Sequence, residues 1–372
     1  MLEKFVEKLN GVPAYLRDWI NTFRGKLTIV CLIGLILLPL ANPGPYILGI
    51  FATFMIYTIF AASWDFLAGF VGQVSFGQAI FLGIAGYVTA YIMKYISLAF
   101  PIYNFQTEQF EWVVIMAQMP WWIALLIGAI IAVLFGLIIG VPALRLKGPY
   151  LALGTLAMSL ILYNLFLMGQ LGILWENTFG TELFGTDGLG QVPPISSNPS
   201  IQYLMIFLIM CASILIMTHI VKSNTGTLFK AIRDDETGAT ASGINTTKYK
   251  ILAFMISGFF AGIAGGLYAL RFSGVNPGLF QPLYSFYAII IAAIGGLATI
   301  SGAALGAFIF VFLGEMLRLL GDIPALDVLG GFTEPIFIFS ILLIIIIRFA
   351  EHGLLQPVLE RIQDMWDLLL GR

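Results

Sequence analysis

Long apolar runs recur along this chain from Leu27 to Phe349. Several approach the length of about 20 residues that a helix needs to cross the hydrocarbon core of a membrane. Little polar sequence separates them, since 59% of the 372 residues are hydrophobic and only 10% are charged. A soluble domain carries about 25% charged residues. The chain therefore has too few polar residues to cover a water-exposed surface. This excludes a soluble globular enzyme and predicts an integral membrane protein.

The apolar runs predict an all-α polytopic membrane protein with about ten transmembrane helices, and no fewer than about eight. The candidate spans are residues 27–43, 46–64, 76–96, 121–141, 149–168, 201–221, 251–271, 284–300, 303–320 and 335–349. Together, residues 27–349 form one transmembrane domain in this prediction. The glycine-rich stretches before residue 76 and around 295–306 are candidates for re-entrant segments.

The two ends of the chain are more polar than the spans. Residues 1–26 place apolar side chains at spacings of three and four among basic residues. This pattern is typical of an amphipathic helix on the inner face of a membrane, and the alternative is a solvated tail. Residues 350–372 are predicted to be a cytoplasmic C-terminal tail.

Basic residues orient the spans, because cytoplasmic loops are enriched in lysine and arginine. With the N-terminus inside, the outer segments hold only Lys94, Arg271 and Arg318 of the 18 basic residues. All the others fall on the inner side. This predicts an even number of spans, with the N-terminus and the C-terminus both cytoplasmic. The outer connectors, residues 97–120 and 169–200, are expected to be irregular.

Motifs of several enzyme classes are missing from the sequence. There is no GxxxxGK[ST] phosphate-binding loop, no HExxH and no GxSxG turn. The two histidines, His219 and His352, fall near predicted helix ends, and Cys31 and Cys211 lie within apolar runs. We therefore expect no catalytic residues, no bound metal and no cofactor. No basic block suggests binding of nucleic acid.

The segment from residue 69 to 78 interrupts an apolar stretch with glycine and polar residues: Gly72, Gln73, Ser75, Gly77 and Gln78. Non-helical backbone at membrane depth is tolerated only where protein or a water-filled cavity covers it. We interpret this segment as the lining of a path for a small polar substrate. The alternative is a helix-packing turn with satisfied polar groups, and spacing alone does not separate the two.

Glycines at a spacing of four predict close helix packing. Gly258, Gly262 and Gly266 fall on one face of the predicted span 251–271, and such faces let helix backbones approach closely. A second glycine-rich break, at 295–302, resembles the one at 69–78. Both breaks face the cytoplasm in the predicted topology, which does not fit a simple inverted repeat.

The inner connector 222–250 predicts a short amphipathic helix that ends near Gly243. One face of this helix would be lined mostly by apolar residues: Leu228, Ala231, Ile232, Asp235 and Ala239. Charged residues would flank that face: Lys230, Arg233, Asp234 and Glu236. Such a helix is suited to docking into a groove of a cytoplasmic partner. The alternative is a solvated connector whose charges only fix topology.

Four sequence blocks resemble a known family. They are Gly69–Ala79 (G-x-x-G-Q-x-S-x-G), Arg145–Ala152 (R-L-x-G-x-Y), Gly185–Leu189 (G-T-[ND]-G-L, with Asp187 where asparagine is common), and Ser223–Gly243 with the helix after it. In this order, they resemble the permease subunit of branched-chain amino acid ABC importers, the LivM type. The resemblance covers about residues 46–320.

The resemblance implies an ATP-driven importer of branched-chain or hydrophobic amino acids in the cell membrane of a prokaryote. Its implied partners are a second homologous permease, two cytoplasmic ATPase subunits and an extracytoplasmic substrate-binding protein. ATP would be used by those partners, and the segment 222–250 would couple to them. Within the path, Thr186 and Asp187 would stand at the outer mouth. The alternatives are a urea or short-amide ABC permease and, from another class, a stand-alone secondary transporter or channel.

Overall fold

The computed structural model describes residues 23–96, 98–104, 109–116, 119–143, 149–168 and 185–321, with the single residues 341, 344 and 361. Most of the predicted amphipathic segment (1–26), the candidate span 335–349 and the tail 350–372 lie outside these residues. So does the first part of the second sequence block named above, at 145–148.

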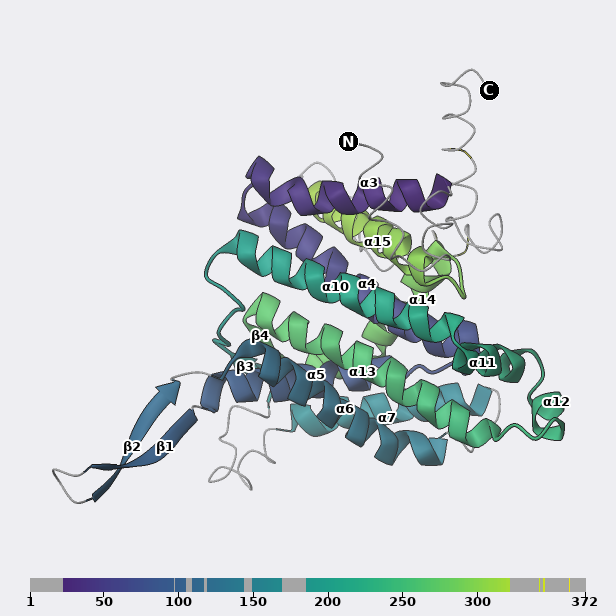
Figure 1. The fold of residues 1–372 in the computed structure, drawn as a ribbon, viewed down its shortest axis with the longest axis horizontal. Helices are drawn as coiled ribbons and strands as arrows, with labels where there is room; N and C mark the ends of the chain where they lie inside the picture. Colours follow the sequence, from purple (N-terminus) through teal and green to yellow (C-terminus); the bar gives the residue numbers. More distant parts are fainter. Residues whose placement is uncertain are drawn as a thin grey trace, which may run out of the picture.

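The described residues form a helical bundle (Figure 1). Its helices are α3 (Phe23–Leu37), η2 (Leu38–Ala41), α4 (Pro45–Val71), α5 (Gln78–Tyr95), α6 (Trp121–Ala143), α7 (Pro149–Leu167), α10 (Pro199–Lys222), α11 (Asn224–Asp234), α12 (Glu236–Ala241), α13 (Thr246–Phe272), η4 (Pro277–Phe280), α14 (Pro282–Gly295) and α15 (Ile300–Gly321). Its strands are β1 (Leu98–Asn104), β2 (Gln109–Met116), β3 (Leu189–Gly190) and β4 (Gly274–Val275).

Six of these helices are long and apolar enough to cross a membrane: α4, α6, α7, α10, α13 and α15. The helical membrane class is therefore confirmed. Each of the first nine candidate spans coincides with a described helix, but the segment that includes α3 and the helix α14 are short. The number of ten spans and the cytoplasmic position of both termini stay predictions.

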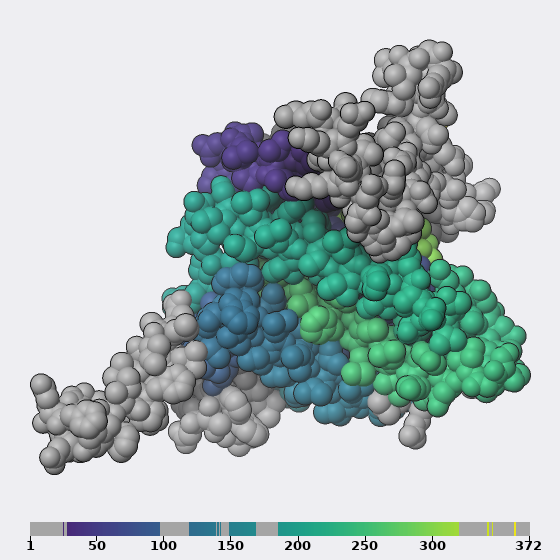
Figure 2. All heavy atoms as spheres, in the orientation of Figure 1, coloured from purple at the N-terminus to yellow at the C-terminus, as the bar shows by residue number. Residues whose placement is uncertain are grey.

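Two helices form the centre of the bundle. In the apolar segments of α4 and α13, 72% and 67% of the residues are buried. In the other four candidate spans, a third or less are buried. Helix α4 packs against α10, α13, α14 and α15, and α13 also packs against α5 and α6. The outer helices present their apolar side chains outward, as lipid requires. Figure 2 shows α10 covering much of one face, beside α6 and the region of α11 to α13.

Glycines let α13 lie close to α5 and α6. A Cβ atom at Gly258 would overlap the ring of Phe81, and one at Gly262 would lie 3.0 Å from the Cα of Ala129. At Gly265 it would overlap the carbonyl oxygen of Leu82. Gly266 likewise faces side chains of α5 and α6. Any larger residue on this face would therefore move the helices apart.

The bundle has two distinct ends. At one end, Leu189 and Gly190 of β3 pair with Val275 and Gly274 of β4; we call this the β3 end. At the other, the α11 end, α11 and α12 join α10 to α13 (Figure 1). The distribution of basic residues predicts that the α11 end is cytoplasmic.

A β-hairpin extends from the β3 end, where the sequence predicted an irregular connector (Figure 1). Strands β1 and β2 pair antiparallel from Leu98↔Met116 to Asn104↔Gln109. The all-α class is corrected to this extent. The two strand sequences are rich in aromatic and β-branched residues, which favour a pleated conformation. The length of an apolar run does not reveal such strands.

Helix α14 begins inside the bundle. The preceding turn η4 places Phe280 in the core, where its ring lies 5.6 Å from that of Tyr87 and 4.5 Å from that of Phe166. The 14 residues of α14 extend about 21 Å at 1.5 Å per residue, less than the roughly 30 Å of a hydrocarbon core. The chain thus re-enters the bundle between α13 and α14.

Candidate functional site

The break between α4 and α5 starts with a left-handed residue. Gly72 has a φ of 73°, a conformation that favours glycine. Its N–H donates to the carbonyl of Ala68 (3.1 Å), and the N–H of Gln73 donates to that of Leu67 (3.2 Å). These bonds satisfy the end of α4 in the manner of a glycine C-cap. The chain then runs without helix to Gly77.

Neighbouring helices satisfy the polar backbone of this break. The indole N–H of Trp64 donates to the carbonyl of Ser75 (2.7 Å). The N–H of Phe76 donates to the hydroxyl of Thr155 on α7 (3.0 Å), and that of Ala79 to the hydroxyl of Ser285 on α14 (2.9 Å). Irregular backbone is thus covered by protein, as a membrane interior demands.

Gln78 lies within the bundle. It is fully buried, and its Nε2 donates to the hydroxyls of Ser63 on α4 (2.8 Å) and Ser257 on α13 (3.1 Å). Its Oε1 is buried without a hydrogen-bond partner among the described residues. Ser75 and Gly77 are buried as well. In this conformation these three residues join helices and do not line an open path.

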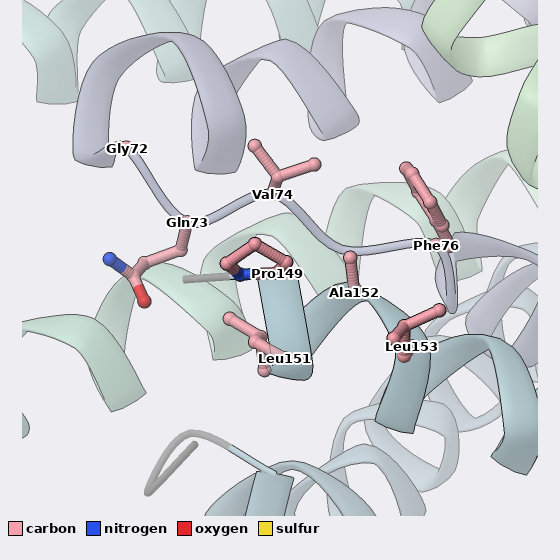
Figure 3. Close-up of a pocket in the computed structure, with 8 residues that line it drawn as sticks. All are labelled: Gly72, Gln73, Val74, Phe76, Pro149, Leu151, Ala152 and Leu153. Carbon is pink, nitrogen blue, oxygen red and sulfur yellow. The ribbon is translucent and has the colours of Figure 1, made fainter. Parts of the chain in front are cut away.

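Gln73 occupies a different position, at a pocket on the α11 end. The pocket has a volume of about 540 Å³ and lies between the break and the start of α7. Its lining is apolar apart from the amide: Gly72, Gln73, Val74, Phe76, Pro149, Leu151, Ala152 and Leu153. Figure 3 shows the side chain of Gln73 on the α7 side of the break, with Val74 pointing the opposite way.

The two glycine-rich breaks meet at the α11 end. The buried carboxylate of Asp65 accepts a hydrogen bond from the N–H of Ala298 (2.8 Å), in the turn between α14 and α15. A Cβ atom at Gly69 would lie 2.6 Å from the nitrogen of Ala298. The carbonyl of Gly69 accepts from Nη1 of Arg233 on α11 (3.0 Å). One short stretch of α4 therefore contacts both the second break and the predicted coupling segment.

The coupling segment differs from the predicted single helix. Helix α11 ends at Asp234, and Asp235 takes an extended conformation and caps α12 by accepting from the N–H of Thr237 (2.9 Å). The prediction of one continuous apolar face is therefore wrong, because the helical period is interrupted at Asp235. Ile232 and Ala239 are buried, whereas Asp235 is exposed.

The most buried side chain of α11 is Phe229, which the predicted face omitted. Its ring lies 5.8 Å from that of Phe66 on α4 and 6.3 Å from that of Tyr249 on α13. The apolar face thus packs on the chain's own bundle. The surface that α11 and α12 leave to a partner is polar, with exposed Lys230 and Arg233. Gly243, two residues after the end of α12, is exposed as well.

An ion pair fixes α12 to α13. Nζ of Lys250 lies 2.6 Å from Oε1 of Glu236, and the lysine side chain is only 8% exposed whereas the glutamate is 43% exposed. A nearly buried ammonium depends strongly on its partner. The rest of the predicted set, Leu228 and Ala231, is partly buried.

Thr186 and Asp187 lie at the β3 end, near the last turn of α7, whereas the pocket lies at the first turn of α7. Both are exposed, and the threonine hydroxyl donates to the aspartate (3.2 Å). The preceding residue Gly185 donates its N–H to the carbonyl of Phe166, close to the end of α7 (2.9 Å). The structure therefore does not bring these two residues together with Gln73.

Several residues that hold the break were missed by the sequence analysis. They are single hydroxyl residues within apolar helices: Ser63, Thr155, Ser257 and Ser285. An isolated serine or threonine in an apolar span is a signal for a hydrogen bond between helices. That signal marks the residues, but it does not identify their partners.

These features define the class of protein: a multi-pass helical membrane protein in which an irregular, protein-covered break between the central helix α4 and α5 meets a helical connector at one end of the bundle. Residues 46–348 match the family described as "Branched-chain amino acid transport system / permease component". The chain belongs to this family and is a membrane permease.

Relatives cover most of the chain at modest identity. The high-affinity branched-chain amino acid transport system permease protein LivM of Salmonella typhimurium is 27% identical, over 89% of this chain and 77% of its own. LivM of Escherichia coli is 28% identical, over 74% and 64%. The ribose import permease protein RbsC of Escherichia coli is 29% identical, over 53% and 60%. No solved structure matches.

Proposed function

We propose that this chain is the permease subunit of an ATP-driven (ABC) importer and forms the path of branched-chain and other hydrophobic amino acids across the cell membrane. Its partners in this proposal are a second homologous permease, two cytoplasmic ATPase subunits and an extracytoplasmic substrate-binding protein. The family match over residues 46–348 and the LivM relatives support the amino acid substrate.

The observation that carries the proposal is the connection of the α11–α12 surface to the centre of the bundle. Phe229 is buried against α4, and Arg233 donates to the carbonyl of Gly69 just before the α4–α5 break. A movement of α11 driven by a partner would therefore displace the end of α4. Coupling between ATP hydrolysis and transport requires an element, such as α11, that contacts both the partner and the transport path.

Substitution of Arg233 tests this proposal. Arg233→Ala removes the hydrogen bond to Gly69 while Phe229 still anchors α11. We expect ATP hydrolysis to persist and uptake of labelled leucine to fall. Lys230→Ala, on the same exposed surface but without a contact to the break, is the matched comparison, because any loss of uptake there should come with loss of the bound ATPase. Normal uptake by both Arg233→Ala and Glu236→Ala would contradict the coupling role.

Sugar import is a second candidate, supported by the ribose import permeases among the relatives. Urea or a short amide is the alternative within the same fold. Uptake of labelled leucine, ribose and urea by the same cells, with and without this chain, separates the three. Saturable leucine uptake that depends on the chain supports the first candidate.

A further inference from the structure

Four tyrosines from three helices lie side by side in the bundle. Tyr57 of α4 is 6.5 Å from Tyr287 of α14 between ring centroids, Tyr287 is 5.6 Å from Tyr284, and Tyr284 is 6.2 Å from Tyr268 of α13. The hydroxyl oxygens of Tyr268 and Tyr284 are 3.3 Å apart. We call these four residues the tyrosine row.

The row extends from the β3 end toward the middle of the membrane. Tyr268 is one turn from the end of α13, and Tyr57 is near the midpoint of α4 (Pro45–Val71). Helices α13 and α14 both pack on α4 but make little contact with each other. The outer part of the row, Tyr268 and Tyr284, lies between these two helices. The inner part, Tyr57 and Tyr287, packs on Phe310 of α15, at 5.7 and 5.0 Å between ring centroids.

The hydroxyls at the inner part of the row lack hydrogen-bond partners in the part of the chain that the structure describes. Tyr57 and Tyr287 have no hydrogen bond among the described residues, and both are only partly buried. Neither hydroxyl is among the sealed, unpartnered polar atoms of the described chain, which are on Asp65, Gln78 and Tyr87. Tyr203 is different, because its hydroxyl donates to the carbonyl of Leu35 (2.8 Å) and so has a structural role.

An unpartnered hydroxyl at membrane depth costs free energy unless a polar group reaches it. Two such hydroxyls on adjacent rings, next to the bonded pair Tyr268 and Tyr284, form a surface that offers hydrogen-bond donors without any fixed charge. Aromatic faces attract cations and also contact apolar groups well. The combination fits a zwitterion with an apolar side chain.

We propose that the tyrosine row is the substrate-contacting wall of the translocation path. The hydroxyls of Tyr57 and Tyr287 donate to the carboxylate of a hydrophobic amino acid, and the ring faces contact its ammonium group and its side chain. This inference rests on the proposed function and names the residues that carry it out. Gln78 and Ser75, in contrast, are enclosed in the bundle.

The test uses the full chain, purified with its accompanying subunits and reconstituted in vesicles. Tyr57→Phe and Tyr287→Phe each remove one hydroxyl and keep the ring. We expect the maximal rate of leucine uptake to fall about tenfold for each, as for loss of a hydrogen bond to a charged group, while the unfolding temperature does not fall. Tyr163→Phe, a partly buried tyrosine of α7 outside the row, is the matched control.

A second measurement keeps the inference testable if the phenylalanine variants fold poorly. In a background with Cys31 and Cys211 replaced by serine, Tyr57→Cys and Tyr287→Cys are treated with a membrane-impermeant thiol reagent. We expect labelling that leucine slows, and no labelling of Tyr87→Cys, whose parent side chain is sealed in the core.

The outcomes separate this inference from the proposed function. If the unmodified complex imports leucine and the double variant Tyr57→Phe/Tyr287→Phe does so at the same rate, the tyrosine row is not the path, while the proposed function stands. Labelling that leucine does not affect would also overturn the inference. If the unmodified complex fails to import leucine, the proposed function itself fails.

Discussion

The buried amide of Gln78 provides a sharp test of how the break is held. Its Nε2 donates to two hydroxyl oxygens whose own protons are already committed: Ser63 donates to the carbonyl of Phe60 (2.6 Å) and Ser257 to that of Ser63 (2.6 Å). The site thus offers acceptors and no donor. A carboxylate at this position would therefore face two hydroxyl oxygens whose protons are already donated elsewhere.

Two substitutions follow from this geometry. Gln78→Met keeps the length of the side chain and loses two hydrogen bonds of about 1 kcal/mol each, partly offset because the partnerless Oε1 is also removed. Gln78→Glu fits only as the neutral acid. At pH 7, protonating a glutamic acid of ordinary pKa near 4.3 costs about 3.7 kcal/mol, and at pH 5 about 1 kcal/mol.

The assay is the unfolding temperature of the purified chain in mild detergent between pH 5 and 7.5. We expect Gln78→Glu to unfold below Gln78→Met at pH 7 and to recover as the pH falls, because stability gained from the neutral acid is lost as pH rises. Gln73→Glu, the same change at the partly exposed pocket, corrects for the ordinary pH dependence. A Gln78→Glu variant as stable as wild type at pH 7 would refute the hydrogen-bond arrangement.

Three further predictions follow from the packing and the pocket. Gly265→Ala should lower the unfolding temperature strongly, because its Cβ would overlap the backbone of α5. Gly34→Ala, with open space around it, should leave the unfolding temperature unchanged. Equal effects would contradict the close packing of α13. Glu236→Gln should destabilise the chain by about 1–3 kcal/mol by leaving the ammonium of Lys250 without its charged partner. The added Lys250→Met should recover most of this loss in the same thermal assay. Gln73→Leu should depress leucine uptake without releasing the ATPase, and unchanged uptake would remove this amide from the path.

The sequence predicts the spans well because apolar length is a local property. The run 201–221 becomes α10 almost residue for residue, and the glycine face of 251–271 indicates close packing before any partner is known. The start of α14 is different. Phe280 lies in the core only because α5 and α7 surround it, and no local pattern contains that information.

The candidate site was only partly predictable for the same reason. The polar residues at 69–78 are evident in the sequence, but whether each one is enclosed or accessible depends on helices far along the chain. Gln78 is enclosed by serines of α4 and α13, whereas Gln73 reaches a pocket. The tyrosine row combines residues more than 200 positions apart, so periodicity and motif searches do not reveal it.

The most direct test of the central claim is to purify the tagged chain from its native membrane in mild detergent and identify the proteins that accompany it. The proposal predicts recovery of a second permease and an ATPase, with ATP hydrolysis in the purified complex. It also predicts loss of the ATPase when several exposed residues of α11 and α12 are replaced together. A chain that is recovered alone and still moves amino acids across reconstituted vesicles without ATP would contradict the proposal and identify a secondary transporter.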